Sequence, residues 1–130
     1  MSLILVADDD RDIRELFELL LSRAGHDVET AADGLEAVEM YRAHRPDLVV
    51  LDFNMPGLTG IEVTRELRSC EGSNVPILLV TASATSGDLA EAAEAGISDH
   101  MIKPPAPTSL CERVAHLLSA QTCAGRQPGA

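Results

Sequence analysis

The chain has 130 residues, the length of about one domain, and hydrophobic residues make up 45% of it, which is enough for a single core. The formal net charge of −11 disfavours direct binding to nucleic acid or to an anionic membrane, and it favours cations and basic partner surfaces. No apolar stretch reaches the roughly 18 residues of a membrane-spanning helix. The N-terminus also lacks the basic and long apolar segments of a signal peptide, so we expect a cytoplasmic protein.

The first half of the chain alternates between apolar runs and amphipathic segments. The run Leu3–Ala7 is continuously apolar, as expected for a strand buried on both faces. Apolar residues at helical spacing follow Asp10, which can cap that helix, and Gly25 ends it. A shorter strand is predicted over residues 27–31, and a helix opened by a capping box is predicted over residues 33–44.

The second half continues this alternation up to a last helix. Its predicted elements are a strand over residues 48–51, a helix over 60–68, a strand over 76–80, a helix over 88–95, a strand over 98–102 and a helix that begins at Pro107. We expect one domain over residues 3–119. Residues 120–130 have no periodicity, and we expect them to form a disordered tail or the start of a linker.

Five strands that alternate with five helices predict an α/β fold, a doubly wound five-stranded parallel sheet. Right-handed crossovers leave few topologies, and the flavodoxin-like order 2-1-3-4-5 is the one expected. In that order the first and third strands are neighbours. The chain winds to opposite sides from there, which opens a crevice at the carboxyl ends of these two strands.

Polar side chains follow four of the predicted strands at the point where each strand ends. Asp8 and Asp9 come after the first strand, Asp52 after the third, Thr81 after the fourth and Lys103 after the fifth. Because the carboxyl ends of parallel strands share one edge of a sheet, these groups should converge there. Carboxylates that meet in this way repel each other unless a cation joins them. The pattern predicts a Mg²⁺-dependent site that handles phosphate.

Four motifs in this order give the chain its resemblance to a known family. They are Val6-Ala7-Asp8-Asp9-Asp10, Leu51-Asp52-Phe53-Asn54-Met55-Pro56-Gly57 with Gly60 behind it, Val80-Thr81-Ala82 and Lys103-Pro104. Over residues 3–119 the chain resembles the CheY-like receiver domain of response regulators in two-component signal transduction. The resemblance implies a phosphoryl-accepting signalling switch that changes its affinity for partners.

The resemblance also assigns roles at the site. Asp52 is expected to accept a phosphoryl group from a histidine kinase or a phosphotransfer protein, with Mg²⁺ as cofactor. Asp9, Asp52 and the backbone carbonyl of Asn54 are the expected direct ligands of the metal, and Asp8 is expected to act through water. Asp10 is assigned to helix capping instead, because it opens the first helix.

The remaining motif residues are expected to act on the phosphoryl group. Lys103 should pair with Asp52 before the reaction and with the phosphoryl group afterwards, and the Lys103–Pro104 peptide is usually cis in this family. Thr81 should donate a hydrogen bond to a phosphoryl oxygen and pull the loop over residues 82–87 with it. That movement is the expected switch.

The chain departs from the family pattern at two positions. His100 stands three residues before the lysine, where receivers usually carry Tyr or Phe, and Pro105 stands where many have Phe. We hypothesise that His100 replaces the switching aromatic; the alternative is a half-exposed histidine on an edge strand. A phosphorylation-dependent dimer is left open, because both changes alter the face that the family commonly uses for dimerisation.

Three other functions remain as alternatives. An aspartate-nucleophile phosphohydrolase needs a general acid two residues after the nucleophile, where this chain has Asn54, which speaks against that function. The resemblance implies self-phosphorylation and autodephosphorylation only. A flavin module is disfavoured because aromatics make up 2% of the chain and the first loop is acidic. The last alternative is a pseudo-receiver that is never phosphorylated. We expect a stand-alone receiver or one excised from a longer protein, without an output domain of its own. Its output would be a downstream protein partner or a fused output domain.

Overall fold

The computed structural model describes residues 2–69, 74–82, 86–103 and 107–126; for Pro107 and residues 120–126 it describes the backbone only. The described elements are β1 (Leu3–Ala7), α1 (Arg11–Arg23), β2 (Asp27–Ala31), α2 (Gly34–His44), β3 (Leu48–Asp52), α3 (Gly60–Ser69), β4 (Ile77–Thr81), α4 (Ser86–Ala95), β5 (Asp99–Ile102) and α5 (Pro107–Arg126). The strands form one parallel sheet in the order β2-β1-β3-β4-β5. The predicted fold is confirmed.

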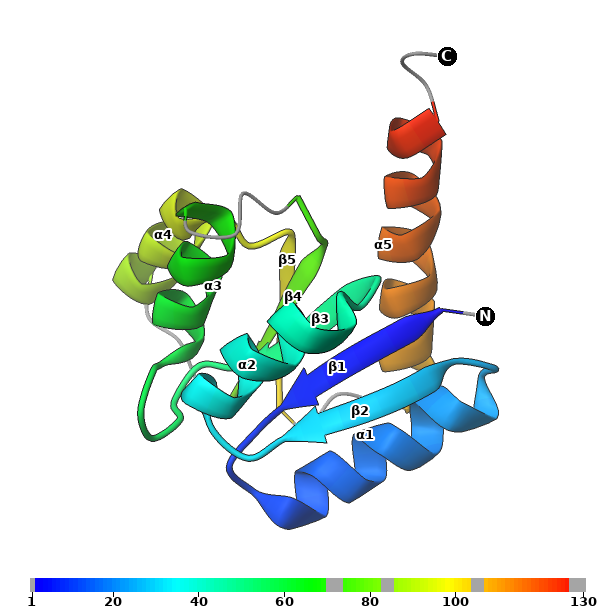
Figure 1. The fold of residues 1–130 in the computed structure, drawn as a ribbon, viewed down its shortest axis with the longest axis horizontal. Helices are drawn as coiled ribbons and strands as arrows, with labels where there is room; N and C mark the ends of the chain where they lie inside the picture. The colour runs from blue at the N-terminus through cyan, green and yellow to red at the C-terminus, as the bar shows by residue number, and fades with distance from the viewer. Residues whose placement is uncertain (1, 70–73, 83–85, 104–106, 127–130) are drawn as a thin grey trace.

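Helices cover both faces of this sheet, with α1 and α5 on one side and α2, α3 and α4 on the other (Figure 1). Successive residues of a strand point to opposite faces, so each strand supplies both layers of the core. In β1, Ile4 and Val6 join Phe17 of α1 and Leu110 of α5 in one cluster. Leu5 and Ala7 belong instead to the cluster that α2, α3 and α4 cover.

The helix starts follow the capping pattern of the sequence, with one difference in α2. Asp10 caps α1, because its Oδ1 accepts hydrogen bonds from the backbone N–H groups of Asp12 and Ile13, at 2.9 and 3.4 Å. Asp33 caps α2 and accepts from the N–H of Glu36 at 2.8 Å. The Glu36 carboxylate, however, accepts from the N–H of Ala32 rather than from that of Asp33, so the reciprocal bond lies one residue before the cap.

Two helix boundaries differ from the sequence expectation by two residues or more. The fourth helix begins at Ser86, two residues before the predicted start. The last helix continues to Arg126, although the sequence predicts a domain that ends at residue 119 and a tail from residue 120. Its apolar stripe ends at Leu118, but Ala120 and Gln121 are good helix formers and an existing helix extends at little cost. Among the described helices, none combines the length and the apolar character needed to cross a bilayer.

Candidate functional site

The polar residues at the C-terminal ends of the strands lie together at one edge of the sheet. The register pairs Ala7 of β1 with Leu51 of β3, and Asp52 with Val80 of β4, so the C-terminal ends of these strands lie side by side. The arrowheads of β1 and β2 mark this edge in Figure 1, where α1 begins. The edge carries the residues that the sequence singled out. Asp8 follows the buried residues of β1, and Asp52 and Thr81 end the buried strands β3 and β4, whereas Lys103 follows β5, which is only partly buried.

Three carboxylates form a group that could hold a metal ion. Asp8, Asp9 and Asp52 each offer an oxygen, and these oxygens lie within 4.8 Å of one another. Asp8 and Asp52 are buried, with 2% and 8% of their surface exposed, whereas Asp9 is exposed. A set of hard oxygen donors that is open on one side fits Mg²⁺, which keeps several waters. Asp10 is outside this group, as the sequence predicts from its capping role.

Lys103 brings a positive charge to these acids. Its Nζ lies 2.6 Å from Oδ2 of Asp8 and 3.2 Å from Oδ1 of Asp52. Its backbone N–H donates to the carbonyl of Thr81 at 2.7 Å, which fixes the residue to the end of β4. The expected pair with Asp52 is present, but the shorter contact is to Asp8. Lys103 therefore bridges two carboxylates from different strands.

Burial and neighbouring charges shift the pKa values of Asp52 and Lys103 at this edge. Burial raises the pKa of Asp52, and the charge of Asp8 raises it further, while Lys103 lowers it without cancelling the rise. Burial alone would lower the pKa of Lys103, but its hydrogen bond with Asp8 and the charge of Asp52 outweigh burial and raise it. A bound cation would oppose the burial and the repulsion from Asp8, which together keep the pKa of Asp52 high.

Every polar group of Asp8 takes part in a hydrogen bond. Its backbone N–H donates to Ala31 at 3.1 Å and its Oδ1 accepts from the N–H of Asp10 at 2.9 Å. Its Oδ2 accepts from Lys103, and its carbonyl oxygen accepts from Nη1 of Arg14 at 2.7 Å. Sequence reasoning missed Arg14. The available signal was its place in the first turn of α1, from which side chains point back toward the start of the helix.

The loop after Asp52 is fixed by close backbone contacts. The N–H of Gly60 donates to the carbonyl of Phe53 at 3.0 Å, and the N–H of Gly34 donates to that of Pro56 at 3.3 Å. A Cβ atom on Gly60 would lie 2.4 Å from the carbonyl oxygen of Asp52, so α3 can begin here only with a glycine. Asn54, the expected carbonyl ligand, is an exposed residue of this loop.

The two expected switch residues lie on β4 and β5. Thr81 is buried at the end of β4. His100 is half-buried and pairs with Leu79, and its neighbour Met101 packs into the cluster under α1 and α5. By strand alternation His100 faces the α4 side of the sheet, together with the exposed Ile102.

Some expectations fall outside the described residues. These are the geometry of the Lys103–Pro104 peptide, the position of Pro105 and most of the loop over residues 82–87.

Comparison with known proteins agrees with this geometry. The sequence matches the family model of the response regulator receiver domain over residues 4–115. Response regulator MprA of Mycobacterium ulcerans is 46% identical over 115 residues, which cover 88% of this chain and 49% of that protein. Response regulator MprA of Mycobacterium avium is 45% identical, with coverage of 88% and 50%. The chain spans about half the length of the curated relatives it matches.

Solved structures resemble the chain over nearly its whole length. The chemotaxis protein CheY4 of Vibrio cholerae is 32% identical with a TM-score of 0.85, covering 90% of this chain and 98% of that one. The receiver domain of the Francisella response regulator 1452 is 30% identical with a TM-score of 0.86, covering 93% and 99%. Sequence and structure together show that this chain belongs to the response regulator receiver domain family of two-component systems.

Proposed function

We propose that the chain is a phosphoryl-accepting switch in which Asp52 is the phosphoacceptor and Mg²⁺ is the cofactor. One observation carries the proposal: the oxygens of Asp8, Asp9 and Asp52 lie within 4.8 Å of one another, and Nζ of Lys103 lies 3.2 Å from Asp52. Receiver domains generally bind Mg²⁺ at an acidic pocket, and the donor set supports that assignment here.

The reaction is a transfer between two side chains. A carboxylate oxygen of Asp52 attacks the phosphorus of a phosphohistidine on the donor, the P–N bond breaks, and the electron pair returns to the imidazole. Asp9, Asp52 and the carbonyl of Asn54 would hold the metal, with Asp8 acting through water. Bound Mg²⁺ supplies positive charge to the phosphoryl oxygens. Lys103 keeps a cation beside the acyl phosphate once the carboxylate charge of Asp52 is used in the bond.

The readout would pass through β4 and β5. Thr81 ends β4 beside Asp52, and its hydroxyl would donate to a phosphoryl oxygen. Its movement would change the start of α4 and the room available to His100 on the same side of the sheet. His100 would then replace the aromatic residue of other receivers, and partner affinity would change on the face formed by α4, β5 and α5.

Turnover of an external phosphate ester is not part of the proposal. Asn54 stands where a phosphohydrolase of this chemistry needs a carboxylic acid, and an amide cannot protonate a leaving group. We therefore propose self-phosphorylation and autodephosphorylation only. A flavin site is disfavoured by the carboxylates at the sheet edge, which would repel a flavin phosphate.

The proposed partners follow from the family. Receiver domains interact with histidine kinases and with output domains. We propose a histidine kinase or phosphotransfer protein as the donor. The recipient of the signal would be a downstream protein or a fused output domain, because the curated relatives are about twice as long as this chain. The net charge of −11 disfavours direct contact with nucleic acid. A phosphorylation-dependent dimer is a further outcome to measure.

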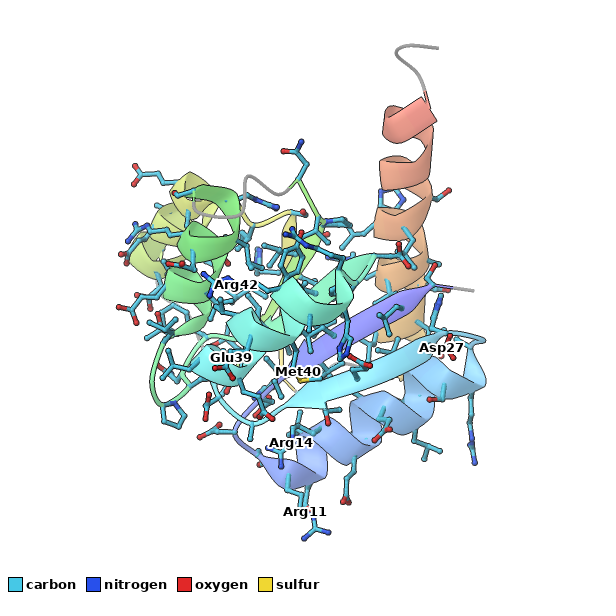
Figure 2. The ribbon with its side chains drawn as sticks, in the orientation of Figure 1. Arg11, Arg14, Asp27, Glu39, Met40 and Arg42 are labelled. Carbon is cyan, nitrogen blue, oxygen red and sulfur yellow. The ribbon has the colours of Figure 1, made fainter. Side chains whose placement is uncertain are left out.

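The test is the intact mass of the protein after incubation with acetyl phosphate, with and without Mg²⁺. We expect a gain of one phosphoryl group that needs Mg²⁺, persists in Asp27→Asn and is lost in Asp52→Asn. Asp27 is the matched control because it is an exposed aspartate at the opposite end of the sheet (Figure 2). No gain in the wild-type protein, together with no effect of beryllofluoride on its amide spectrum, would leave the pseudo-receiver as the function.

A further inference from the structure

The guanidinium of Arg14 holds one peptide of the site. Its Nη1 lies 2.7 Å from the carbonyl oxygen of Asp8, which belongs to the peptide that joins Asp8 to Asp9. The ladder between β1 and β2 ends just before this group, because its last bond runs from the N–H of Asp8 to Ala31. Arg14 therefore binds the first carbonyl group that lies beyond the end of this ladder.

The two neighbouring aspartates differ in how firmly they are held. The carboxylate of Asp8 is buried and bound through both oxygens, to the N–H of Asp10 and to Lys103. The carboxylate of Asp9 is exposed, and no described residue donates a hydrogen bond to it. The direction of the Asp9 side chain therefore depends on its backbone, whose first peptide is the one that Arg14 binds.

We propose that Arg14 is a positioning residue of the metal site, which orients the Asp8–Asp9 peptide so that Asp9 points toward Asp52. The identification of the cation as Mg²⁺ rests on the proposed function, whereas the positioning itself rests on the contact with the carbonyl oxygen. A partner that orients a metal ligand commonly changes metal affinity by tenfold or more when it is removed.

The charge of Arg14 and its positioning role predict opposite effects on metal affinity when the residue is replaced. The positive charge of Arg14 repels a divalent cation, so removing that charge alone would strengthen metal binding. Removing the hydrogen bond frees the Asp8–Asp9 peptide to rotate, so the loss of positioning would weaken metal binding. The direction of the change in affinity therefore separates the two roles.

Arg11 offers a matched control on the same helix. Its side chain is 80% exposed and pairs with Glu15 one turn further along α1, at 3.0 Å. In Figure 2 Arg11 points away from the sheet, whereas Arg14 lies beside the ends of β1 and β2. Replacing Arg11 by Gln removes the same charge from the same helix without touching Asp8.

The experiment measures binding of Mn²⁺, used as a paramagnetic stand-in for Mg²⁺, to the whole unphosphorylated chain by electron paramagnetic resonance. We expect Arg14→Gln to weaken binding about tenfold. Arg14→Lys, which keeps the charge and can donate one hydrogen bond, should recover part of the loss, and Arg11→Gln should bind like the wild type. Thermal unfolding of each variant verifies that it is folded. An affinity of Arg14→Gln equal to or tighter than that of Arg11→Gln overturns the proposal.

One spectroscopic and one kinetic measurement distinguish a positioning role of Arg14 from a general disturbance of the fold. The ¹⁵N–¹H resonance of Asp9, whose nitrogen belongs to the same peptide, should shift more in Arg14→Gln than resonances elsewhere in α1. The Mg²⁺ concentration that gives half the maximal phosphorylation rate should rise, while the rate at saturating Mg²⁺ is retained. Failure of the wild type to accept phosphate, with Mn²⁺ affinities as expected, would refute the proposed function and leave the positioning role standing. A wild type that binds no Mn²⁺ refutes the positioning role.

Discussion

The ammonium of Lys103 lies 2.6 Å from a carboxylate oxygen of Asp8, although the two residues are 95 positions apart in the chain. Both side chains are shielded from water, with 15% and 3% of their surface exposed. The same ammonium reaches Asp52 at 3.2 Å. The contact joins β1 and β5 across the sheet edge, so it contributes both to stability and to the site.

Replacing Lys103 by Met should destabilise the metal-free protein by about 3 kcal/mol, because two buried carboxylates lose their counter-charge. Added Mg²⁺ should restore much of this loss by binding the same carboxylates. Urea denaturation with EDTA and with Mg²⁺ measures both effects. The control is Arg11→Met, which breaks an exposed pair and should change stability little. Equal stability of Lys103→Met and the wild type in EDTA would contradict the prediction.

Asp52 should make the metal-free protein less stable as the pH rises. Burial and the charge of Asp8 raise the pKa of Asp52 in the folded state, despite the opposing effect of Lys103. Between the ordinary aspartate pKa of about 3.9 and this higher value, the folded state binds more protons than the unfolded state. Its stability therefore falls as the pH rises through this window and stays lower above it.

The measurement is the free energy of unfolding in EDTA from acidic to neutral pH. Asp52→Asn should remove the decline, so that near neutral pH this variant is more stable than the wild type. Asp27→Asn, which changes an exposed aspartate, should follow the wild-type curve. Mg²⁺ should reduce the difference in the free energy of unfolding between Asp52→Asn and the wild type. A variant less stable than the wild type at every pH would show that the Asp52 carboxylate stabilises the fold instead.

Gly60 should be needed for both the fold and the site. A Cβ atom there would lie 2.4 Å from the carbonyl oxygen of Asp52 and 2.9 Å from Cδ1 of Leu79, so the start of α3 must move. We expect Gly60→Ala to cost about 2 kcal/mol and to weaken Mn²⁺ binding by displacing the loop after Asp52. Gly25→Ala is the control: its φ of 99° makes it strained, but its Cβ would meet no atom within 4 Å. It should lower stability by about 1 kcal/mol and leave Mn²⁺ affinity unchanged.

His100 should respond to the state of Asp52. It faces the α4 side of the sheet from β5, because it pairs with Leu79 of that layer, and we expect its ring to move when Thr81 moves. Beryllofluoride should shift amide resonances of β5 and α4 in the wild type and in His100→Tyr, and these shifts should shrink in His100→Ala. His116→Ala, which changes an exposed histidine of α5, should behave like the wild type. If the shifts are unchanged in His100→Ala, His100 takes no part in the switch and is only a half-buried residue of the edge strand.

The local features of this protein were predictable from the sequence. Apolar runs predicted β1, β3 and β4, and the residues that follow these runs predicted Asp8, Asp52 and Thr81 at the sheet edge, because both depend on a few consecutive residues. The cap at Asp10 was predictable for the same reason. Alternation of strands and helices then gave the sheet order, since right-handed crossovers leave few topologies.

Contacts between distant side chains were decided only by the tertiary structure. The sequence could not tell that Lys103 lies nearer to Asp8 than to Asp52, or that Arg14 binds the carbonyl of Asp8, because both depend on how β5 and α1 pack against β1. Gly60 belongs to the motif that carries the resemblance, but only the tertiary structure gives its physical reason, which is the close approach of α3 to the carbonyl of Asp52. The sequence determined which groups reach the sheet edge, and the packing of the layers decided which of them touch.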